Sequence, residues 1–530
     1  MKYFSPVDRW LSFSLLLITL FLVKGLIYLS IMPPFEGWDE YQHVAYISYL
    51  DQHKERPVLD HAFVDQDLLE KIISFPVPGF MLDQIQSAGA VGYKTFNDPN
   101  FQGTQYNNKH QPINLYQAQH GALYYRLVLP ITKYLDARNA DFLDIIYILK
   151  FLNLVFITIS LASLLWLLNR IVAQKSHAAM IALLIFSLPL LVINACRIAN
   201  DPFAIMTGTF VVIIGILPQF RRRIVFSFLV GILIGISCWT KSTATVLFPF
   251  WICCIFLSYY KKEITFKQAT IFLLVSNLIA IAILSQYFIF NIRNYGMLFV
   301  MQEAIVNRSN NISAFDMLSI AGLPAVQDII FMWFKDTIWK GGWSLLKVSD
   351  ISNISFVLIS FSLLSWIYNI IFKIKRKGSL LPDASLICFS IVFFTSLALG
   401  WHYVQSKVAW GYPTTCAWYT CLSLPMFLMF VYDSASRWST RTGFVIASLL
   451  ISLYLYADIR GILSMLSLYS GGNTGYEALE RISLIHPLWL STPILLVCLL
   501  IFLCLVSVSL MTVVRTNRHI FITDKNMAKP

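Results

Sequence analysis

Four titratable side chains lie within eight residues in the segment Pro33-Pro-Phe-Glu-Gly-Trp-Asp-Glu-Tyr-Gln-His43. They follow the first long apolar run of the chain, and they are Glu36, Asp39, Glu40 and His43. A helix that began near Trp38 would place Asp39 and His43 one turn apart on the same face. A partly desolvated carboxylate has a raised pKa and can act as a general base. The alternative is a hydrated helix cap, which needs fewer titratable groups than this segment holds.

Two short turns between later apolar runs carry cations. The first is Arg197-Ile-Ala-Asn-Asp201, and the second is Cys-Trp-Thr-Lys241-Ser-Thr. A lone Lys at a membrane interface often extends its amine to water, and Asp201 is also a candidate cap for the next helix. A bound phosphate would account for both cations, because Lys or Arg beside a leaving phosphate stabilises the charge that develops as its bond breaks.

Other polar residues have less context. Lys24 lies inside the first apolar run, where we expect it to reach outward or to pair with a carboxylate of the following loop. The stretch 105–116 is rich in Asn, Gln and Tyr, which suits contact with a sugar and is equally typical of an ordinary surface loop. His402, Arg460 and Glu480 are polar candidates without a motif.

The elements that must position these groups are transmembrane helices. The chain has 530 residues, of which 57% are hydrophobic and only 13% are charged, against about 25% charged in soluble proteins. A membrane core needs about 20 apolar residues of helix. On that criterion we predict an all-α polytopic membrane protein with about twelve spans, near 11–32, 145–168, 178–196, 201–217, 224–240, 243–260, 268–290, 351–372, 384–404, 414–432, 442–457 and 488–514.

Basic residues predict the orientation. With both termini in the cytoplasm, half of the 40 lysines and arginines fall in short cytoplasmic segments. These are Lys2, Arg9, Arg170, Lys175, Arg221, Arg222, Arg223, Lys261, Lys262, Lys267, Lys373, Lys375, Arg376, Lys377, Arg437, Arg441, Arg515, Arg518, Lys525 and Lys529. Most of the net charge of +12 is therefore explained by topology, and it does not indicate binding to nucleic acid.

This orientation places the chemically suggestive residues on the extracytoplasmic face. We predict a single membrane domain over residues 1–530, with a first extracytoplasmic loop at 33–144, a second large one at 291–350 and a late one at 458–487. The nine cysteines lie in or beside apolar runs and show no zinc-type spacing, so we expect them to pack as small apolar residues.

Four short motifs in order resemble the GT-C superfamily of membrane glycosyltransferases. Trp-Asp39-Glu40-x-x-His43 is similar to the Asp-Glu-x-x-His of protein O-mannosyltransferases, and closer to a prokaryotic multi-spanning family that starts Pro-Pro-x-x-x-x-Asp-Glu-x-x-His. Gln111-Pro-Ile-Asn-Leu-Tyr and Leu123-Tyr-Tyr resemble two pieces of a Pro-Pro-Leu-Tyr-Tyr segment. The Arg197–Asp201 turn resembles a second acidic motif, and Trp239-Thr-Lys241 resembles the span-five Thr-Lys. Trp410-Gly-Tyr-Pro413 stands where some relatives have Gly-Arg-Tyr.

The resemblance implies an inverting sugar transferase that uses a polyprenyl-phosphate-linked sugar and a glycan, lipid or protein acceptor. It implies that Asp39 takes the proton of the acceptor hydroxyl. Arg197 and Lys241, with Arg293, would hold the lipid phosphate. Glu40 would be the second catalytic carboxylate and would orient the acceptor or Asp39. The residues that contact or orient the acceptor would be Glu36, His43 and Asp201. Many relatives need no metal, although Asp39, Glu40 and His43 are capable ligands of a divalent ion.

Other functions fit parts of the sequence. A transporter or flippase of a lipid-linked or anionic solute suits the span number and Lys24, but the halves show no repeat and the first loop is longer than transport needs. A polysaccharide polymerase or ligase is closer in chemistry, and a membrane scaffold is favoured least. The expected location is the plasma membrane of a prokaryote, with the endoplasmic reticulum as the alternative.

Overall fold

The computed structural model is built from helices and describes residues 6–321, 324–338, 342, 344, 349–371 and 382–522. Within these residues, extended backbone pairs only at two isolated bridges, Phe63 with Asn114 and Val77 with Gly92. The all-α class is therefore confirmed. Several basic residues that the sequence assigns to the cytoplasm lie outside the described residues, namely Lys2, Lys373, Lys375, Arg376, Lys377, Lys525 and Lys529.

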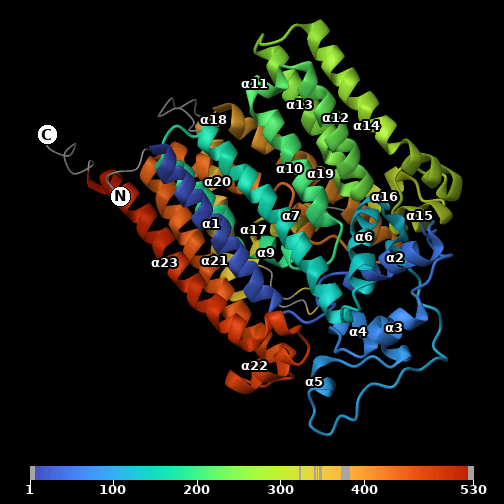
Figure 1. Ribbon diagram of the computed structural model, residues 1–530. Helices are drawn as coiled ribbons and strands as arrows, with labels where there is room; N and C mark the ends of the chain where they lie inside the picture. The colour runs from blue at the N-terminus through green and yellow to red at the C-terminus, as the bar shows by residue number, and fades with distance from the viewer. Residues whose placement is uncertain are drawn as a thin grey trace.

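Eight stretches of helix in the described residues are long and apolar enough to cross a membrane. They are formed by α1 (Pro6–Leu29), α7 (Phe142–Ile171), η3 with α13 (Ser242–Val246, Leu247–Tyr260), α14 (Phe266–Tyr295), α18 (Ser349–Ile371), α19 (Pro382–Trp410), α21 (Thr440–Tyr469) and η6 with α23 (Leu488–Leu490, Thr492–Ile522). These stretches establish an integral membrane protein (Figure 1).

The remaining predicted spans are shorter or broken helices, so twelve full spans are not found in the described residues. The stretch predicted at 178–196 is α8 (Lys175–Ser187) and α9 (Pro189–Ala195), bent by 56° at a proline, and it raises the count to at most nine. The others are α10 (Asp201–Ile216), α12 (Ile224–Thr240) and α20 (Leu424–Trp438), with the short α11 (Pro218–Arg221) between the first two. At 1.5 Å per residue such helices fall short of a core about 30 Å thick.

The first loop folds into short helices that sit against the ends of the spans. They are α2 (Glu40–His53), α3 (Gln66–Ile73), α4 (Gly79–Ile85), η1 (Gln86–Ala88), α5 (Tyr93–Phe96), η2 (Tyr116–Gln119) and α6 (Leu123–Asp136). In Figure 1, α2 and α6 lie side by side at the outer end of α14. The loop therefore forms a folded layer over one end of the helical bundle.

Two later segments complete that layer. The second loop contains α15 (Gln302–Ser309), α16 (Ala314–Ala321), the apolar α17 (Pro324–Phe334) and η4 (Asp336–Ile338). The 3-10 turn η5 (Ala417–Thr420) precedes α20, and α22 (Gly475–Ser483) follows α21. Helix α21 continues to Tyr469, so residues 458–469 are helical where the sequence predicts the start of a loop. Asp458, the first residue of the predicted loop, lies within this helix and pairs with Lys24.

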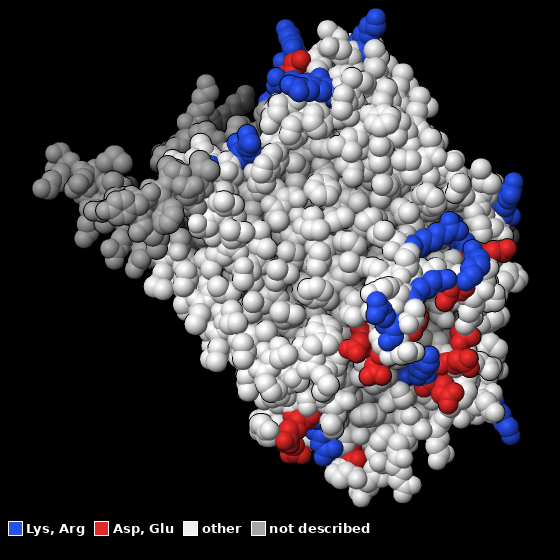
Figure 2. Space-filling view, viewed as in Figure 1, with Lys and Arg blue, Asp and Glu red and all other residues white. Residues whose placement is uncertain are grey.

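Charged side chains gather at two ends of the molecule. Figure 2 shows Lys and Arg at the upper edge, near α11 and the α13–α14 connection, where Arg222, Lys261 and Lys262 are exposed. A mixed patch of both signs lies over the first-loop helices, and a broad uncharged surface separates the two ends (Figure 2). This distribution fits a membrane band and places the two groups of charges on opposite sides of it.

Candidate functional site

Asp39 occupies the turn that starts α2, but outside the helix. Its φ of 61° lies in the left-handed region, which Asp adopts more easily than most residues. Its Oδ1 accepts a hydrogen bond from the Tyr116 hydroxyl at 2.7 Å. Desolvation raises the pKa of Asp39, while Tyr116 and the charges of Lys241 and Arg197 oppose that rise. Asp39 as a residue is half-buried, whereas Glu36, Glu40 and His43 are buried.

Glu40 is fully buried, and its carboxylate is occupied by contacts within the protein. Its Oε2 accepts from the Gly37 N–H at 2.9 Å and lies 3.0 Å from Lys150 Nζ, and its Oε1 accepts from the Ile198 N–H at 2.7 Å. It thereby joins the first loop to α7 and to the turn after α9. The sequence predicts a catalytic role for Glu40, and the structure gives it three internal partners instead of an open edge.

Gly37 allows the first loop to approach the turn that follows α9. A Cβ at this position would stand 2.5 Å from Arg197 Cβ and 2.5 Å from Glu40 Cδ. Real Cβ atoms do not approach other heavy atoms so closely, and neither neighbour has space to move because both side chains are buried. The glycine is therefore required by contact, since its backbone angles are open to other residues.

The two pieces of the predicted Tyr-rich segment both reach the first motif. Tyr116 from the first piece binds Asp39, and Tyr125 from the second places its hydroxyl 2.8 Å from His43 Nδ1. His43 is 1% exposed, and burial lowers its pKa well below 6.5, so the imidazole is neutral near pH 7. Asp39 and His43 thus stand near one another in sequence but bind different tyrosines.

Arg197, Asp201 and Lys241 form one buried ionic group. Asp201 Oδ2 lies 2.9 Å from Arg197 Nη2 and 3.3 Å from Lys241 Nζ. Arg197 also donates to Asn194 Oδ1 at 2.7 Å and to the Trp38 carbonyl at 3.2 Å. One carboxylate therefore offsets part of two positive charges, and the group keeps a net charge of about +1 near neutral pH. Asp201 begins α10 without a side-chain cap, so its predicted capping role is not seen.

A pocket lies directly against this group. The pocket is small, and it is lined by Asp201, Ala204, Ile205, Lys241, Thr243, Ala244, Trp418, Tyr419 and Leu422. Trp418 stacks on Trp38 with ring centroids 4.1 Å apart, and Lys241 Nζ lies 5.6 Å from the centre of the Tyr419 ring. The pocket thus has a charged wall, an aromatic wall and an apolar side.

Glu36 lies behind the motif in a closed environment. Its Oε2 accepts from the Tyr93 hydroxyl at 2.5 Å, and its two oxygens accept from the backbone and hydroxyl of Ser344 at 2.9 Å each. Burial raises its pKa to about 7, although these hydrogen bonds pull it down. Glu36 therefore connects the first loop to the second and is partly protonated near neutral pH.

The other predicted residues lie apart from this group or only at its border. Arg293 is exposed on α14, and no contact in the described residues joins it to the ionic group. His402 packs edge-on to Tyr419 at 5.3 Å between ring centroids, so it borders the pocket wall. Arg460 donates to Tyr456 on the exposed side of α21, and Glu480 is exposed on α22.

Several positioning residues were missed from the sequence. Lys150 on α7 binds Glu40, and Asn153 one turn later donates to the carbonyls of Arg197 and Ala199 at 2.7 and 3.1 Å. Both are polar groups inside an apolar run, and such groups need partners in a membrane. The polar residues inside the apolar run are visible in the sequence, whereas the identity of their partners depends on the fold.

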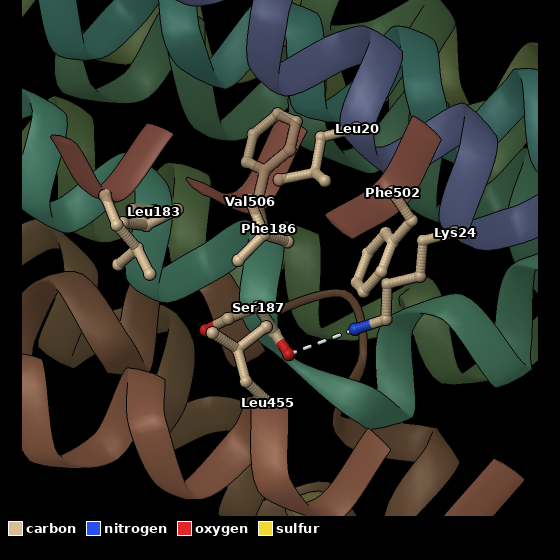
Figure 3. A pocket seen from close by; sticks show the side chains of 9 residues that line it. Leu20, Lys24, Leu183, Phe186, Ser187, Leu455, Phe502 and Val506 are labelled. Atoms are coloured by element: carbon tan, nitrogen blue, oxygen red, sulfur yellow. Dashed lines mark hydrogen bonds between the residues drawn. The ribbon is translucent and has the colours of Figure 1, made fainter. Parts of the chain in front are cut away.

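Lys24 pairs with a later helix and not with the first loop, which corrects the prediction for it. Its Nζ lies 2.6 Å from Asp458 Oδ2 and donates to the Ser187 carbonyl at 3.1 Å (Figure 3). That carbonyl is at the bend before Pro189, where proline interrupts the backbone hydrogen bonds of the helix. Tyr28 donates to the other oxygen of Asp458 at 2.7 Å. Lys24 therefore joins α1, α8 and α21, and it lines a largely apolar pocket (Figure 3).

The candidate metal ligands do not converge. Among the described residues, no group of three or more His, Cys, Asp or Glu side chains is arranged to hold a metal ion. Glu40 turns toward Lys150 and His43 toward Tyr125, which leaves Asp39 without a second ligand from its own motif. The residues present therefore do not fit the divalent ion that the sequence allows.

Comparison with known proteins gives a distant structural likeness. No family model and no curated protein matches the chain. The oligosaccharyltransferase of Archaeoglobus fulgidus in complex with zinc and sulfate is similar with a TM-score of 0.40 and 12% identity, over 88% of this chain and 54% of that chain. The oligosaccharyltransferase AglB of the same organism, with an inhibitory peptide and a dolichol-phosphate, gives a TM-score of 0.41 and 11% identity, over 87% and 57%. The chain thus spans little more than half the length of these proteins, and a likeness at this level assigns neither fold nor activity.

Proposed function

We propose that the chain is an inverting glycosyltransferase that moves a sugar from a polyprenyl-phosphate carrier to an acceptor hydroxyl on the extracytoplasmic face. The observation that carries the proposal is the carboxylate of the half-buried residue Asp39 beside the Arg197–Asp201–Lys241 group. A carboxylate base next to an excess positive charge suits a reaction that removes a proton at one end and releases a phosphate at the other.

In the proposed reaction, Asp39 accepts the proton of the acceptor hydroxyl. The acceptor oxygen forms a bond to the anomeric carbon as the bond from that carbon to the phosphate oxygen breaks. The phosphate leaves with the electron pair, beside Lys241 in the pocket that Asp201 and Tyr419 also line. The products are the glycosylated acceptor, the polyprenyl phosphate and protonated Asp39, which returns its proton to water. Attack from the face opposite the phosphate inverts the anomeric carbon.

The remaining predicted residues act as positioning groups in this proposal. Glu40 and Lys150 hold the first loop against the Arg197 turn, and Glu36 holds it against Ser344. His43 supports Tyr125 within the same layer. Arg197 orients Asp201 and adds positive charge, while exposed Arg293 has no assigned partner in the described residues and would have to meet a substrate at the rim.

The test is transfer from labelled donors in membranes that contain or lack the protein. Vesicles of known orientation receive polyprenyl-phosphate sugars with a radiolabelled sugar, and label is followed both into acceptors and across the bilayer. The proposal predicts protein-dependent label in a non-extractable acceptor and inversion at the labelled carbon. Protein-dependent movement of intact donor across the bilayer without transfer would instead support the transporter alternative.

A further inference from the structure

Glu303 is a buried carboxylate on α15 that the proposed reaction does not use. Its Oε1 accepts a hydrogen bond from the Thr414 hydroxyl at 3.1 Å and lies 3.8 Å from His402 Nε2. Its Oε2 takes no hydrogen bond within the described residues, although the residue is only 9% exposed. Because a buried carboxylate is stable only when donors reach its oxygens, Oε2 is available to a ligand that supplies one.

Contacts among the second loop, α19 and the turn after α19 fix the place of this carboxylate. His402 Nδ1 lies 2.7 Å from the Thr415 hydroxyl, which holds the imidazole in position. The Asn307 amide of α15 donates to the Gln405 carbonyl of α19 at 3.0 Å. The carboxylate therefore lies on two helices that are joined to each other, and it is held as a binding group must be.

One aromatic ring connects this carboxylate to the pocket of the ionic group. The Tyr419 ring, which lines the pocket, lies 5.3 Å from the His402 ring between centroids and 5.6 Å from Lys241 Nζ. Burial raises the pKa of the Tyr419 hydroxyl, and nearby charges, those of Asp39 and Glu303 among them, raise it further. The proposed base and the unused carboxylate thus act on the same ring.

The short turn η2 connects the base to α15 from the other side. Its first residue, Tyr116, binds Asp39, and the side-chain Oε1 of its last residue, Gln119, accepts from the Gln302 N–H at 3.1 Å. The rise of a 3-10 helix over three residues is about 6 Å, close to the width of one sugar ring. Figure 1 shows α15 at the same end of the bundle as α2 and α6. A single sugar therefore suits the space between the base and Glu303.

We propose that Glu303 binds hydroxyl groups of the donor sugar through Oε2 while Lys241 binds the phosphate of the same donor. This inference rests on the proposed function and adds the residue that recognises the sugar. A carboxylate oxygen accepts from hydroxyls, and a hydrogen bond to a charged group is stronger than one between neutral groups. His402 and Thr414 are positioning residues, because they contact the carboxylate and leave Oε2 open.

Equilibrium binding to the purified full-length protein in lipid nanodiscs tests this assignment. The radiolabelled probes are decaprenyl phosphate and its mannose, glucose and galactose derivatives, and no acceptor is added, so only a donor site is measured. The variants are Glu303→Gln, which removes the charge at nearly constant size, and Lys241→Gln. Glu70→Gln on the exposed side of α3 is the matched control. Thermal unfolding of each variant reports whether it is folded.

Glu303→Gln is expected to weaken the tightest sugar-bearing probe by about tenfold and decaprenyl phosphate by less than about twofold. Lys241→Gln should weaken both kinds of probe together, and Glu70→Gln neither. Unchanged binding of the sugar-bearing probe to folded Glu303→Gln, or an equal loss for decaprenyl phosphate, overturns the assignment and leaves the proposed function standing. A wild type that binds no sugar-bearing probe better than decaprenyl phosphate also overturns it. Glu303-dependent binding in a protein that transfers no sugar supports the assignment while the proposed function fails.

Discussion

Three features of its surroundings set the pKa of the Asp39 carboxyl group, and they act in opposite directions. Burial raises the pKa of its carboxyl group, whereas the Tyr116 hydroxyl and the nearby cations lower it. A general base works best when its pKa is close to the working pH but its carboxylate is still present. Of the four titratable groups in its motif, Asp39 alone is half-buried, and Glu36, Glu40 and His43 are buried.

Removing the Tyr116 hydroxyl should shift the acid side of the pH profile. Asp39 must be deprotonated to act, so activity falls as the pH drops through its folded pKa. In Tyr116→Phe the carboxylate loses a donor that lowers this pKa, and the loss of activity should begin at a higher pH. The measurement is kcat/KM for sugar transfer against pH, with Tyr134→Phe on exposed α6 as the control. A profile that moves to lower pH, or not at all, would exclude Asp39 as the titrating base.

At the scale of elements, the site depends on the contact between the first loop and the turn after α9. The loop side contributes Gly37 and Glu40, and the turn contributes Arg197 and Ile198. Helix α7 connects the two, because Lys150 pairs with Glu40 and Asn153 donates to the Arg197 carbonyl. Each of these polar groups is buried, so the arrangement tolerates little displacement.

Gly37→Ala should disturb this contact, because its Cβ would overlap both Arg197 and Glu40. We expect a loss of about 1–3 kcal/mol of stability, typical of overpacking, and a larger relative loss of transfer. Gly79→Ala is the matched control, since no heavy atom lies within 4 Å of a Cβ there. Thermal unfolding and transfer are measured for both. Equal behaviour of the two variants would mean that the loop and the turn are not in contact as described.

The sequence predicts the site in part, and the reason for its failures is physical. Asp39, Asp201 and Lys241 stand in motifs beside apolar runs. The order of these runs and the positions of the basic residues therefore predict that the three residues lie on the same side of the membrane. The sequence does not predict the partners of Lys24 and Lys150, because each of them pairs with a group far away in the chain. Arg293 is exposed on α14, and no contact in the described residues joins it to the ionic group.

At the scale of the whole molecule, the apolar runs of the sequence include every long helix of the described residues, whereas the count of twelve spans stays a prediction. Helices α10 and α20 are apolar and largely buried, and a buried helix resembles a membrane span in composition without needing its length. Helix α12 is also shorter than a span, but it exposes apolar side chains such as Val225 and Phe228 at 69% and 51%. The bend between α8 and α9 follows from Pro189, which ends one helix and begins the next. Charged side chains separate into two ends of the molecule (Figure 2), but which end faces the cytoplasm stays a prediction.

Cysteine labelling tests that orientation. Glu55→Cys beside α2 and Lys262→Cys at the α13–α14 connection are both exposed positions at opposite ends. An impermeant maleimide should label the first in intact cells and the second only after permeabilisation. The unsubstituted protein is the control for its nine native cysteines. The reverse pattern would place the candidate site in the cytoplasm and contradict the orientation.

The most direct test of the central claim is sugar transfer by Asp39→Asn. The substitution keeps the size of the side chain but removes the carboxylate that accepts the proton. Purified full-length protein is supplied with radiolabelled polyprenyl-phosphate sugar and acceptor, and Asp136→Asn on the exposed end of α6 is the matched control. The account predicts that kcat falls by about 10²–10⁴-fold in Asp39→Asn with donor binding retained, and stays near the wild type in Asp136→Asn. Wild-type transfer by a folded Asp39→Asn protein would contradict it.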